Sequence, residues 1–515
     1  MMKLPIPSLK TTKANFIKHA LAYPSFDKNL IDRFFDNSAI KLQKLLQNYD
    51  LHMNSSYLER NWTKSYLKTR EPLSIASNFC FKLPKQYDLN DFIYTFAKLI
   101  KAYDNNELEF ITSRGNKLFK RQFEILKGGC RVPKSTCDEF NLSFKNTNYI
   151  SILHNNNLYK ADVLSTLSGI KMEFKKEKRD ISFAHLSFCN SDEAARLYDQ
   201  YEEYNVFFNT IENSRFNISI INKEFNNFDK EQHYMLYLAP IYHYKTLNFI
   251  YNESTKNIYV NTEHSFLDGG TIAFILEWIY NNLQSPTHFV KAHYIKQYYD
   301  NAYINTIKKN LNKYTNLSAN GTFSCKLESE KSAEFSKDFI LQAAIVYACK
   351  NIYKRYVSQY EAVDVREYDY GRTECVRAIS TQLQKALDSF KKQDFLLANK
   401  EHKIRIKSCK KGQGIDRHLF GLKIMNRGIN DIVANKFFNS KMYEDVCKTI
   451  ISTSSLGKND YIDIFYFHPV HSDGLGISYA CVDNEYYFSC TYFNENKFNL
   501  FKKFVCEFFT KFKFV

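Results

Sequence analysis

One histidine stands beside the residue types that acid–base chemistry requires. His264 is followed four residues later by Asp268 and then by two glycines. A neutral imidazole can act as a general base near neutral pH, and a neighbouring carboxylate can orient it or stabilise its charged form. The segment lies between an expected strand and an expected helix, a common place for a catalytic loop. The residues alone also fit a turn in which Asp268 caps the helix and His264 is incidental.

Four further segments carry polar side chains suited to binding or catalysis. They are Tyr370–Arg377, Gly412–Leu422, Ile451–Ser455 and His468–Gly476. The arginines of the first can bind a carboxylate or phosphate, and the hydroxyl groups of the third can donate hydrogen bonds to an oxyanion. The Asp-Arg-His triplet of the second fits a polar cluster at the edge of a core. Taken singly, each segment fits an ordinary solvated turn, surface ion pair or loop at least as well.

The last of these segments has a weak metal-binding pattern. Its His-x-x-His-x-Asp spacing contains Pro469, which prevents both histidines from lying on one helix face. The chain has no P-loop, no Gly-x-Ser-x-Gly elbow and no dinucleotide-binding glycine loop. We therefore expect neither a metal site nor a bound cofactor.

Helical and strand-like patterns alternate along the chain and must position these segments. Helical spacing of apolar residues covers 30–49, 91–103, 270–281 and 337–356. Strand-like runs cover 149–153, 216–221, 247–251, 257–260, 462–467, 477–482 and 486–492. This mixture predicts an α/β or α+β fold. The only sign of a domain boundary is a weak one, a polar stretch near 291–315.

Length and composition narrow the class of protein. The 515 residues exceed one ordinary core and favour two domains, and 44% apolar residues exclude a disordered chain. The net charge of +16 fits a nucleic-acid binder, an anionic membrane surface, a phosphorylated ligand, or a simple lysine bias. Because the lysines are scattered, the sign of the charge decides nothing alone.

Targeting and redox signals are scarce. The 12 cysteines form no Cys-x-x-Cys motif, which favours free thiols in a reducing compartment. The first ten residues hold two prolines and no apolar core of a secretory signal. No apolar stretch reaches the ~20 residues of a membrane span. We expect a cytoplasmic protein without a transmembrane segment.

The order and spacing of these segments resemble the choline/carnitine acyltransferase family, from residue 4 to the end of the chain. The matching motifs are Leu4-Pro-Ile-Pro7 with Leu9, Tyr66-Leu-x-x-Arg-x-Pro-Leu73, Asn78, Leu83-Pro84, Glu263-His-Ser265, Asp268-Gly269, Gly371-Arg-Thr-Glu374, Asp416-Arg-His-Leu-x-Gly-Leu422, Ser452-Thr-Ser454 and Asp473-Gly-x-Gly476. Chance agreement of so many ordered motifs is improbable.

The resemblance implies a fold and a reaction. Members have two similar α/β domains of the chloramphenicol acetyltransferase-like type, with an active-site tunnel between them. We map one domain to 1–75 plus 295–515 and the other, which carries the histidine, to 76–294. Members transfer an acyl group reversibly between coenzyme A and the hydroxyl of carnitine or choline. Acyl-CoA and L-carnitine are thus the expected partners, with no nucleic acid involved, and we expect a monomer.

The resemblance also assigns the reaction residues. His264 matches the general base, which acts without an acyl-enzyme intermediate. Asp268 and Arg372 match a pair that stabilises the loop around it. Ser454 matches the hydroxyl near the tetrahedral oxyanion.

Substrate-binding residues follow in the same way. Tyr360, Thr373 and Arg417 match the residues that bind the carnitine carboxylate, and choline-specific members lack the Arg and Thr. Expected CoA contacts are Lys331, which would face the 3′-phosphate, with Asp338, Glu361 and Ser455. The chain departs from the family where a second phosphate-binding Lys falls on Leu327, beside Lys326, and where Ala378 replaces a frequent Ser. Lys337 would add positive charge.

One position bears on acyl-chain length. Long-chain members open their acyl pocket with a Gly on the strand after the Ser-Thr-Ser loop, and ungapped counting places Phe465 there. A phenyl ring would fill the pocket and favour acetyl or another short acyl group. A one-residue slip would instead turn Phe465 to the other face of the strand. Choline, a longer acyl group, and a non-catalytic or nucleic-acid-binding protein stay open as alternatives.

Overall fold

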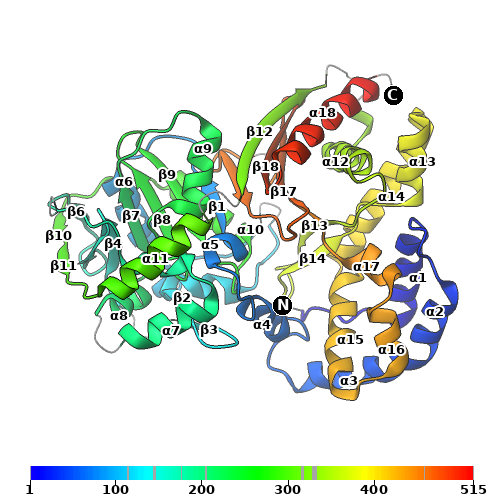
Figure 1. The fold of residues 1–515 in the computed structure, drawn as a ribbon, viewed down its shortest axis with the longest axis horizontal. Helices are drawn as coiled ribbons and strands as arrows, with labels where there is room; N and C mark the ends of the chain where they lie inside the picture. Colours follow the sequence, from blue (N-terminus) through cyan, green and yellow to red (C-terminus); the bar gives the residue numbers. More distant parts are fainter. Residues whose placement is uncertain are drawn as a thin grey trace.

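The structure is a computed structural model of the chain. It describes residues 2–112, 115–142, 147–174, 177–202, 206–314, 318–327, 333–457, 459–513 and 515. Two large mixed sheets, each with helices packed on it, lie side by side (Figure 1). The predicted α/β class is therefore confirmed. Within the described residues, no helix is both long and apolar enough to cross a membrane.

The first sheet has eight strands and takes one of them from late in the chain. Its order is β11 (His293–Ile295), β5 (Asn157–Ala161), β4 (Ile150–His154), β7 (Asn217–Ile221), β8 (Leu247–Asn252), β9 (Asn257–Thr262), β1 (Phe79–Lys82) and β16 (Ile464–Phe467). Strand β1 pairs antiparallel with β9 on one side and with β16 on the other. The C-terminal part of the chain thus completes the sheet that leads to His264.

Helices pack on both faces of this sheet. They are α6 (Leu89–Asp104), η2 (Lys120–Lys127), η3 (Phe183–Phe188), α7 (Ser191–Tyr201), α8 (Val206–Asn213), α9 (Phe228–His233), η4 (Tyr234–Leu238), α10 (Gly269–Asn281) and α11 (Asn301–Tyr314). Helices α6 and α10 share one apolar core with the strands, and η3, α7, α8 and α11 form another. Small ladders join β2 (Gly129–Val132) to β3 (Glu139–Leu142) and β6 (Gly169–Lys171) to β10 (Phe289–Lys291).

The second sheet has six strands and lies in the other half of the molecule. Its order is β12 (Ala319–Lys326), β18 (Glu485–Tyr492), β17 (Leu475–Val482), β15 (Ile451–Ser454), β13 (Gln359–Asp364) and β14 (Thr373–Val376). Helices of this half are α12 (Lys337–Tyr353), α13 (Thr381–Ser389), α14 (Lys392–Lys410), α15 (Asp416–Ile429), α16 (Ile432–Phe438), α17 (Lys441–Cys447) and α18 (Glu495–Phe512). Helices α12 and α18 pack together beside β12, while α14 lies against β13 and β14.

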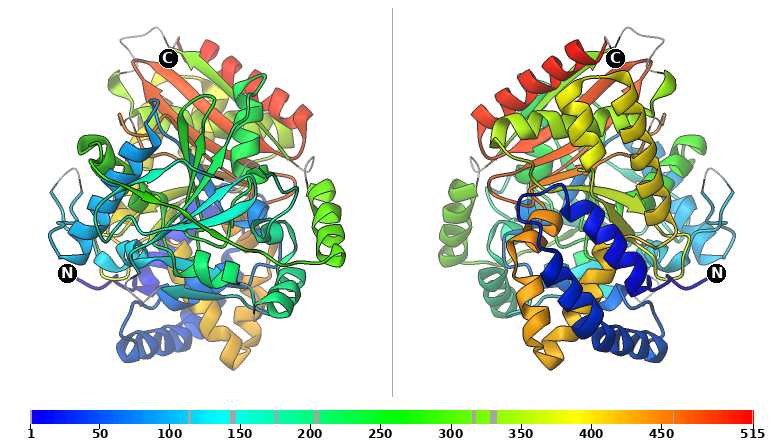
Figure 2. Two further views of the ribbon diagram at one scale, coloured as in Figure 1. Left: turned by 90° about the vertical axis from the view of Figure 1, so that its left-hand side faces the viewer. Right: turned by 90° about the vertical axis from the view of Figure 1, so that its right-hand side faces the viewer.

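The N-terminal helices join this second half. They are α1 (Leu9–Ala20), α2 (Lys28–Arg33), η1 (Phe34–Ser38), α3 (Ala39–His52) and α4 (Glu59–Leu67), whereas α5 (Leu73–Ala76) packs on η3 and η4 of the first half. Figure 2 shows the first of them, in blue, beside the orange helices of the C-terminal part, and α1 contacts α17 while α3 contacts α15. One apolar core includes both sets of helices. The boundaries near residues 75 and 295 stay a prediction.

A π-turn interrupts the helix expected over 30–49. The adjacent residues Phe34 and Phe35 of this turn, η1, are both buried in the core. The Phe34 ring stacks on Phe437 with 4.0 Å between centroids, and Phe35 meets the same ring at 5.8 Å. Both rings of η1 thus pack against α16.

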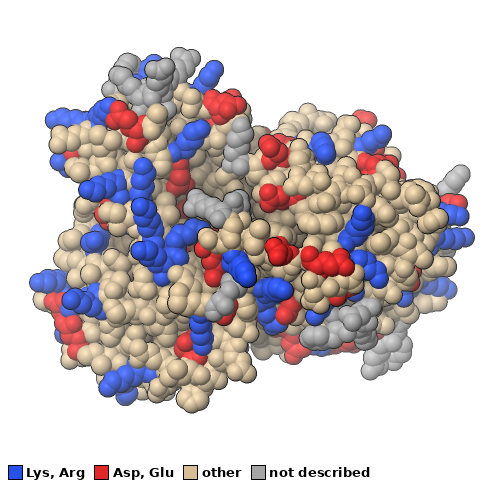
Figure 3. Space-filling model, turned by 180° about the vertical axis from the view of Figure 1, so that it is seen from behind, with Lys and Arg blue, Asp and Glu red and all other residues tan. Residues whose placement is uncertain are grey.

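Charged side chains are distributed over both halves. Figure 3 shows lysines and arginines mixed with acidic residues on the face seen there, with a column of basic side chains on its left half. Basic side chains therefore occur on both halves of this face.

Candidate functional site

The loop between β9 and α10 holds His264 in one tautomer. Its Nδ1 donates a hydrogen bond to the carbonyl oxygen of Leu267 at 2.6 Å, since a carbonyl can only accept. The proton therefore sits on Nδ1, and Nε2 carries the lone pair. This is the form of imidazole that can remove a proton from a hydroxyl group.

Aromatic neighbours keep the His264 ring neutral. The ring lies 5.0 Å from the ring of Tyr66 and 4.8 Å from that of Phe79, measured between centroids. Burial lowers the pKa of His264 to about 4, and the nearby Asp268 carboxylate only partly offsets that effect. At neutral pH the ring is uncharged and able to accept a proton.

A buried arginine clamps the backbone of the same loop. Arg372 donates to both carboxylate oxygens of Asp268, at 3.1 and 3.2 Å. It also donates to the carbonyl oxygens of His264, at 2.9 Å, and Leu267, at 3.0 Å, and to that of Ser265. Burial alone would raise the pKa of Asp268, but Arg372 holds it below its usual value. The loop is thus fixed by one cation from the other half of the molecule.

Asp268 does not cap helix α10. It occupies the N-cap position but makes no side-chain capping bond. The alternative interpretation of this segment as a simple capped turn is therefore wrong. The residue before Arg372 is a glycine for a steric reason, because a Cβ on Gly371 would lie 2.0 Å from the carbonyl oxygen of Val365.

A second support of the loop was not predicted. Gln122, on η2, donates to the Asp268 carboxylate at 2.8 Å and accepts from the Asp268 backbone N–H at 2.9 Å. It also accepts from the hydroxyl of Thr271 at 2.7 Å. Sequence patterns give no signal for this contact, because η2 and the loop are far apart in the chain.

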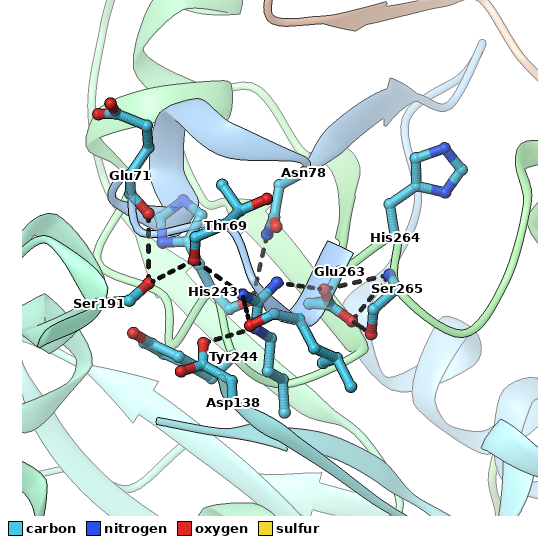
Figure 4. Close-up of polar contacts among 12 residues, drawn as sticks. Thr69, Glu71, Asn78, Asp138, Ser191, His243, Tyr244, Glu263, His264 and Ser265 are labelled. Carbon is cyan, nitrogen blue, oxygen red and sulfur yellow. Dashed lines mark hydrogen bonds and ion pairs between the residues drawn. The ribbon is translucent and has the colours of Figure 1, made fainter. Parts of the chain in front are cut away.

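A buried ion network underlies the residues next to His264. Glu263 accepts from the backbone N–H of Ser265 at 3.1 Å, and Arg131 bonds Glu263 at 3.3 Å and Asp138 at 2.8 Å. In Figure 4, Glu263 and Ser265 face one another while the His264 ring points away from the network. The network holds the end of β9 in place, and none of these bonds involves the His264 ring.

The Arg372 clamp predicts a large effect on stability. Replacing Arg372 with Met should lower the free energy of unfolding by about 3–5 kcal/mol, because it leaves the Asp268 carboxylate buried without a cation. Urea unfolding followed by circular dichroism measures the change. Arg355→Met is the matched control, since Arg355 is largely exposed and lies 3.7 Å from Asp445. Equal losses in both variants would contradict the clamp.

Three predicted binding residues come together on β13, β14 and α15. Arg417 donates to the Tyr360 hydroxyl at 2.7 Å, to the Thr373 hydroxyl at 3.3 Å and to the Thr373 carbonyl at 2.6 Å. Its guanidinium lies 3.8 Å from the centroid of the Trp62 ring. No carboxylate lies within 4.0 Å of the Arg417 guanidinium in the part of the chain that the structure describes. The group thus keeps its charge among neutral partners.

The surroundings of this cluster are buried. Arg377 donates to Asp416 at 3.0 Å, with both side chains less than a tenth exposed. The alternative interpretations of 370–377 as a solvated turn and of Asp416 and Arg417 as part of a surface ion pair are therefore wrong. Burial raises the pKa of Glu374 to about 7, although Arg417 opposes the shift.

Two of the predicted CoA contacts lie in one hydrogen-bonded cluster. Glu361 accepts from Gln342 at 2.7 Å and from the Thr453 hydroxyl. Asp338 accepts from His402 at 2.6 Å and from the Tyr479 hydroxyl at 2.7 Å. Burial, and next the charge of Asp338, raise the pKa of Glu361 well above its usual value. Lys331 lies outside the described residues.

The remaining predicted residues flank the strand crossing between the halves. Ser454 ends β15 and is half-buried, and Ser455 accepts from the N–H of Gly457 at 3.1 Å. Phe465, on β16, lies opposite Phe81, with 5.7 Å between their rings. Phe79 and Phe81 are two residues apart on one strand and therefore point to the same face, so Phe465 shares the face on which Phe79 meets His264. Its part in limiting chain length stays a prediction.

The weak metal pattern has other partners. The N–H of Asp473 donates to Nδ1 of His471 at 3.1 Å, and Lys497 forms an ion pair with the Asp473 carboxylate. Throughout the described ranges, no group of three or more metal-ligating side chains comes together.

The family model that matches this chain and the relatives described here agree on one protein family. A family model described as choline/carnitine O-acyltransferase matches residues 4–508. Human carnitine O-acetyltransferase is 24% identical over an alignment that covers 96% of this chain and 89% of that protein. The mitochondrial carnitine O-acetyltransferase of Saccharomyces cerevisiae is 32% identical over 160 residues, which are 29% of this chain and 23% of that protein. Human mitochondrial carnitine O-palmitoyltransferase 2 is 28% identical over 30% of this chain and 25% of that protein.

Among solved structures, the epimerization domain from the third module of tyrocidine synthetase B superposes with a TM-score of 0.39 and 10% identity. That match covers 88% of this chain and 95% of the other.

Proposed function

The chain belongs to the choline/carnitine acyltransferase family, and from this premise we propose that it transfers an acyl group reversibly between coenzyme A and the hydroxyl of L-carnitine. The observation that carries the proposal is the bond from Nδ1 of His264 to a backbone carbonyl, which leaves Nε2 as a neutral base. A non-catalytic protein would have no need for a loop clamped so firmly around that tautomer.

The reaction follows from this base. Nε2 of His264 removes the proton from the carnitine hydroxyl as its oxygen attacks the thioester carbonyl, and a tetrahedral oxyanion forms. The hydroxyl of Ser454 donates a hydrogen bond to that oxyanion, a type of contact worth several kcal/mol in acyl transfer. The C–S bond then breaks, and the proton on Nε2 passes to the departing thiolate. No residue of the protein becomes acylated.

Carnitine rather than choline is the proposed acceptor because of Arg417. A guanidinium among neutral partners offers its charge to an incoming carboxylate, and carnitine carries one where choline does not. Tyr360 and Thr373 add hydroxyl groups beside it. Asp338, Glu361, Ser455 and Lys331 are the proposed contacts for CoA.

The test of the function is a matrix of substrates. Acetyl-, octanoyl- and palmitoyl-CoA are each incubated with L-carnitine and with choline. Release of the CoA thiol is measured by absorbance with a thiol reagent that gives a coloured product. Thiol release from acetyl-CoA that requires L-carnitine is the expected result. Release that requires choline would mean that choline, not L-carnitine, is the acceptor. If neither acceptor causes thiol release, acyl transfer to these alcohols is rejected.

Phe465 predicts the response to chain length. Phe465→Gly should raise kcat/KM for octanoyl-CoA relative to acetyl-CoA by at least about 10- to 200-fold, the range that a single methylene group provides in an apolar pocket. The reason is that the phenyl ring lies on the face of the sheet that meets His264. Tyr487→Gly, on the exposed part of β18, is the matched control. An unchanged ratio would mean that Phe465 does not limit the acyl pocket.

A further inference from the structure

A cavity of about 420 Å³ lies in the half that carries the eight-stranded sheet. It opens between the C-terminal end of α6, both ends of η2 and the segment before β7. Its wall includes Lys101 of α6 with Lys120 and Lys127, the first and last residues of η2. The cavity is large enough for a small metabolite rather than a single ion.

The charges on its wall leave an excess of cations. Arg215 is buried in the wall and is neutralised by Asp104, to whose carboxylate it donates at 2.7 and 3.1 Å. It also donates to the carbonyl oxygen of Leu126 at 3.0 Å. Asp104 is the one acidic residue among the described lining residues. The Asp104 carboxylate is therefore paired with Arg215 and does not neutralise the lysines of the wall.

Three lysines remain without such a partner. In the described ranges no carboxylate lies within 4.0 Å of the amino groups of Lys101, Lys120 or Lys127. Lys120 instead lies over the ring of Phe110, 5.9 Å from its centroid. Three lysines on the wall of one polar cavity favour a ligand with several negative charges, and phosphate is a common one for lysine.

The cavity is separate from the residues around His264. None of its lining residues belongs to the loop at 263–268 or to the Arg417 cluster. The helix η2 lies between the two sites, since Gln122 of that helix bonds Asp268 while the lysines at its ends line the cavity. A ligand here would not occupy the space of the transferred acyl group.

We propose that this cavity is a second anion site, which binds a small phosphorylated metabolite with at least two negative charges. The terminal phosphate oxygens would lie among Lys101, Lys120 and Lys127. The side chains of Tyr103 and Phe110, whose rings are 6.2 Å apart, form the apolar part of the wall.

Calorimetric titration of the full chain with pyrophosphate tests the proposal. Saturable binding that persists in the presence of excess CoA is expected, because the two sites are separate. Lys101→Gln/Lys127→Gln should weaken that binding at least tenfold, and Lys120→Gln should weaken it in the same direction. The matched control, Lys44→Gln/Lys436→Gln, changes exposed helical lysines outside the cavity and should bind as the unmodified chain does.

Three results would overturn the proposal of a second anion site, and a fourth would overturn its assignment to phosphate. The first three are no saturable binding, complete displacement of pyrophosphate by CoA, and equal affinity in the cavity variants and the control. Malonate serves as the comparison dianion, and affinity for malonate equal to that for pyrophosphate would overturn the assignment to phosphate.

Discussion

His264→Ala is expected to lower kcat for acetyl transfer by on the order of 10²–10⁴-fold, the usual contribution of a general base. The substitution removes Nε2, the lone pair that receives the hydroxyl proton, while Arg372 continues to hold the loop through backbone carbonyls. Initial rates with acetyl-CoA and L-carnitine measure the change. His52→Ala, at an exposed position on α3, is the control.

The pH profile separates a base from a structural histidine. Because the pKa of His264 is lowered to about 4, its ring is neutral above that pH and gains a proton as the pH falls through it. The rate should therefore decline on the acid side near pH 4, rather than near the unperturbed histidine value of about 6.5. A limb at the unperturbed value would contradict the lowered pKa, and full activity of His264→Ala would contradict the assignment of the base.

Arg417→Asn is expected to raise the KM for L-carnitine far more than the KM for acetyl-CoA. Loss of one partner of a desolvated charge pair costs about 2–5 kcal/mol, or roughly 30- to 4,000-fold in affinity. Steady-state kinetics with each substrate varied in turn measure the two constants. Arg427→Asn is a matched control, since Arg427 lies on the same helix and is exposed.

The contrast between substrates protects this prediction from a trivial explanation. Arg417 also packs on Trp62 and bonds Tyr360, so its loss could loosen the site as a whole. A general loosening would raise both KM values by similar factors, and that outcome would make Arg417 structural. Weak activity with choline should be unaffected by the change, because choline has no carboxylate to lose its partner.

Local sequence patterns predict the elements around the reaction but not their convergence. The helix expected over 270–281 is α10, and the run at 257–260 is part of β9, so the loop of His264 is predictable from its flanks. Apolar periodicity carries this information because it depends only on near neighbours in the chain. The same periodicity does not distinguish a π-turn from an α-helix, so it does not predict the break at η1, where Phe34 stacks on the distant Phe437.

The meeting of Tyr360, Thr373 and Arg417 was predicted only through family resemblance. Their contacts join two strands and a helix, and residue spacing along the chain does not predict contacts between such distant segments. Gln122 shows the limit most clearly, since an isolated glutamine on a short helix has no motif at all. The pairing of β16 with β1 was unpredictable for the same reason, because the four apolar residues of β16 do not indicate which strand they pair with.

That pairing of β16 with β1 has a consequence for biosynthesis. A ribosome makes β1 and the helices α1 to α3 early, but β16 and the helices α15 to α17 come only late. Until then, one edge of β1 lacks its hydrogen-bonding neighbour, and the apolar faces of α1 and α3 lack the core that they finally share. Exposed strand edges and apolar faces of this kind favour association between nascent chains. The first segments to be synthesised are thus among the last to fold, and chaperones have the longest time to act on them.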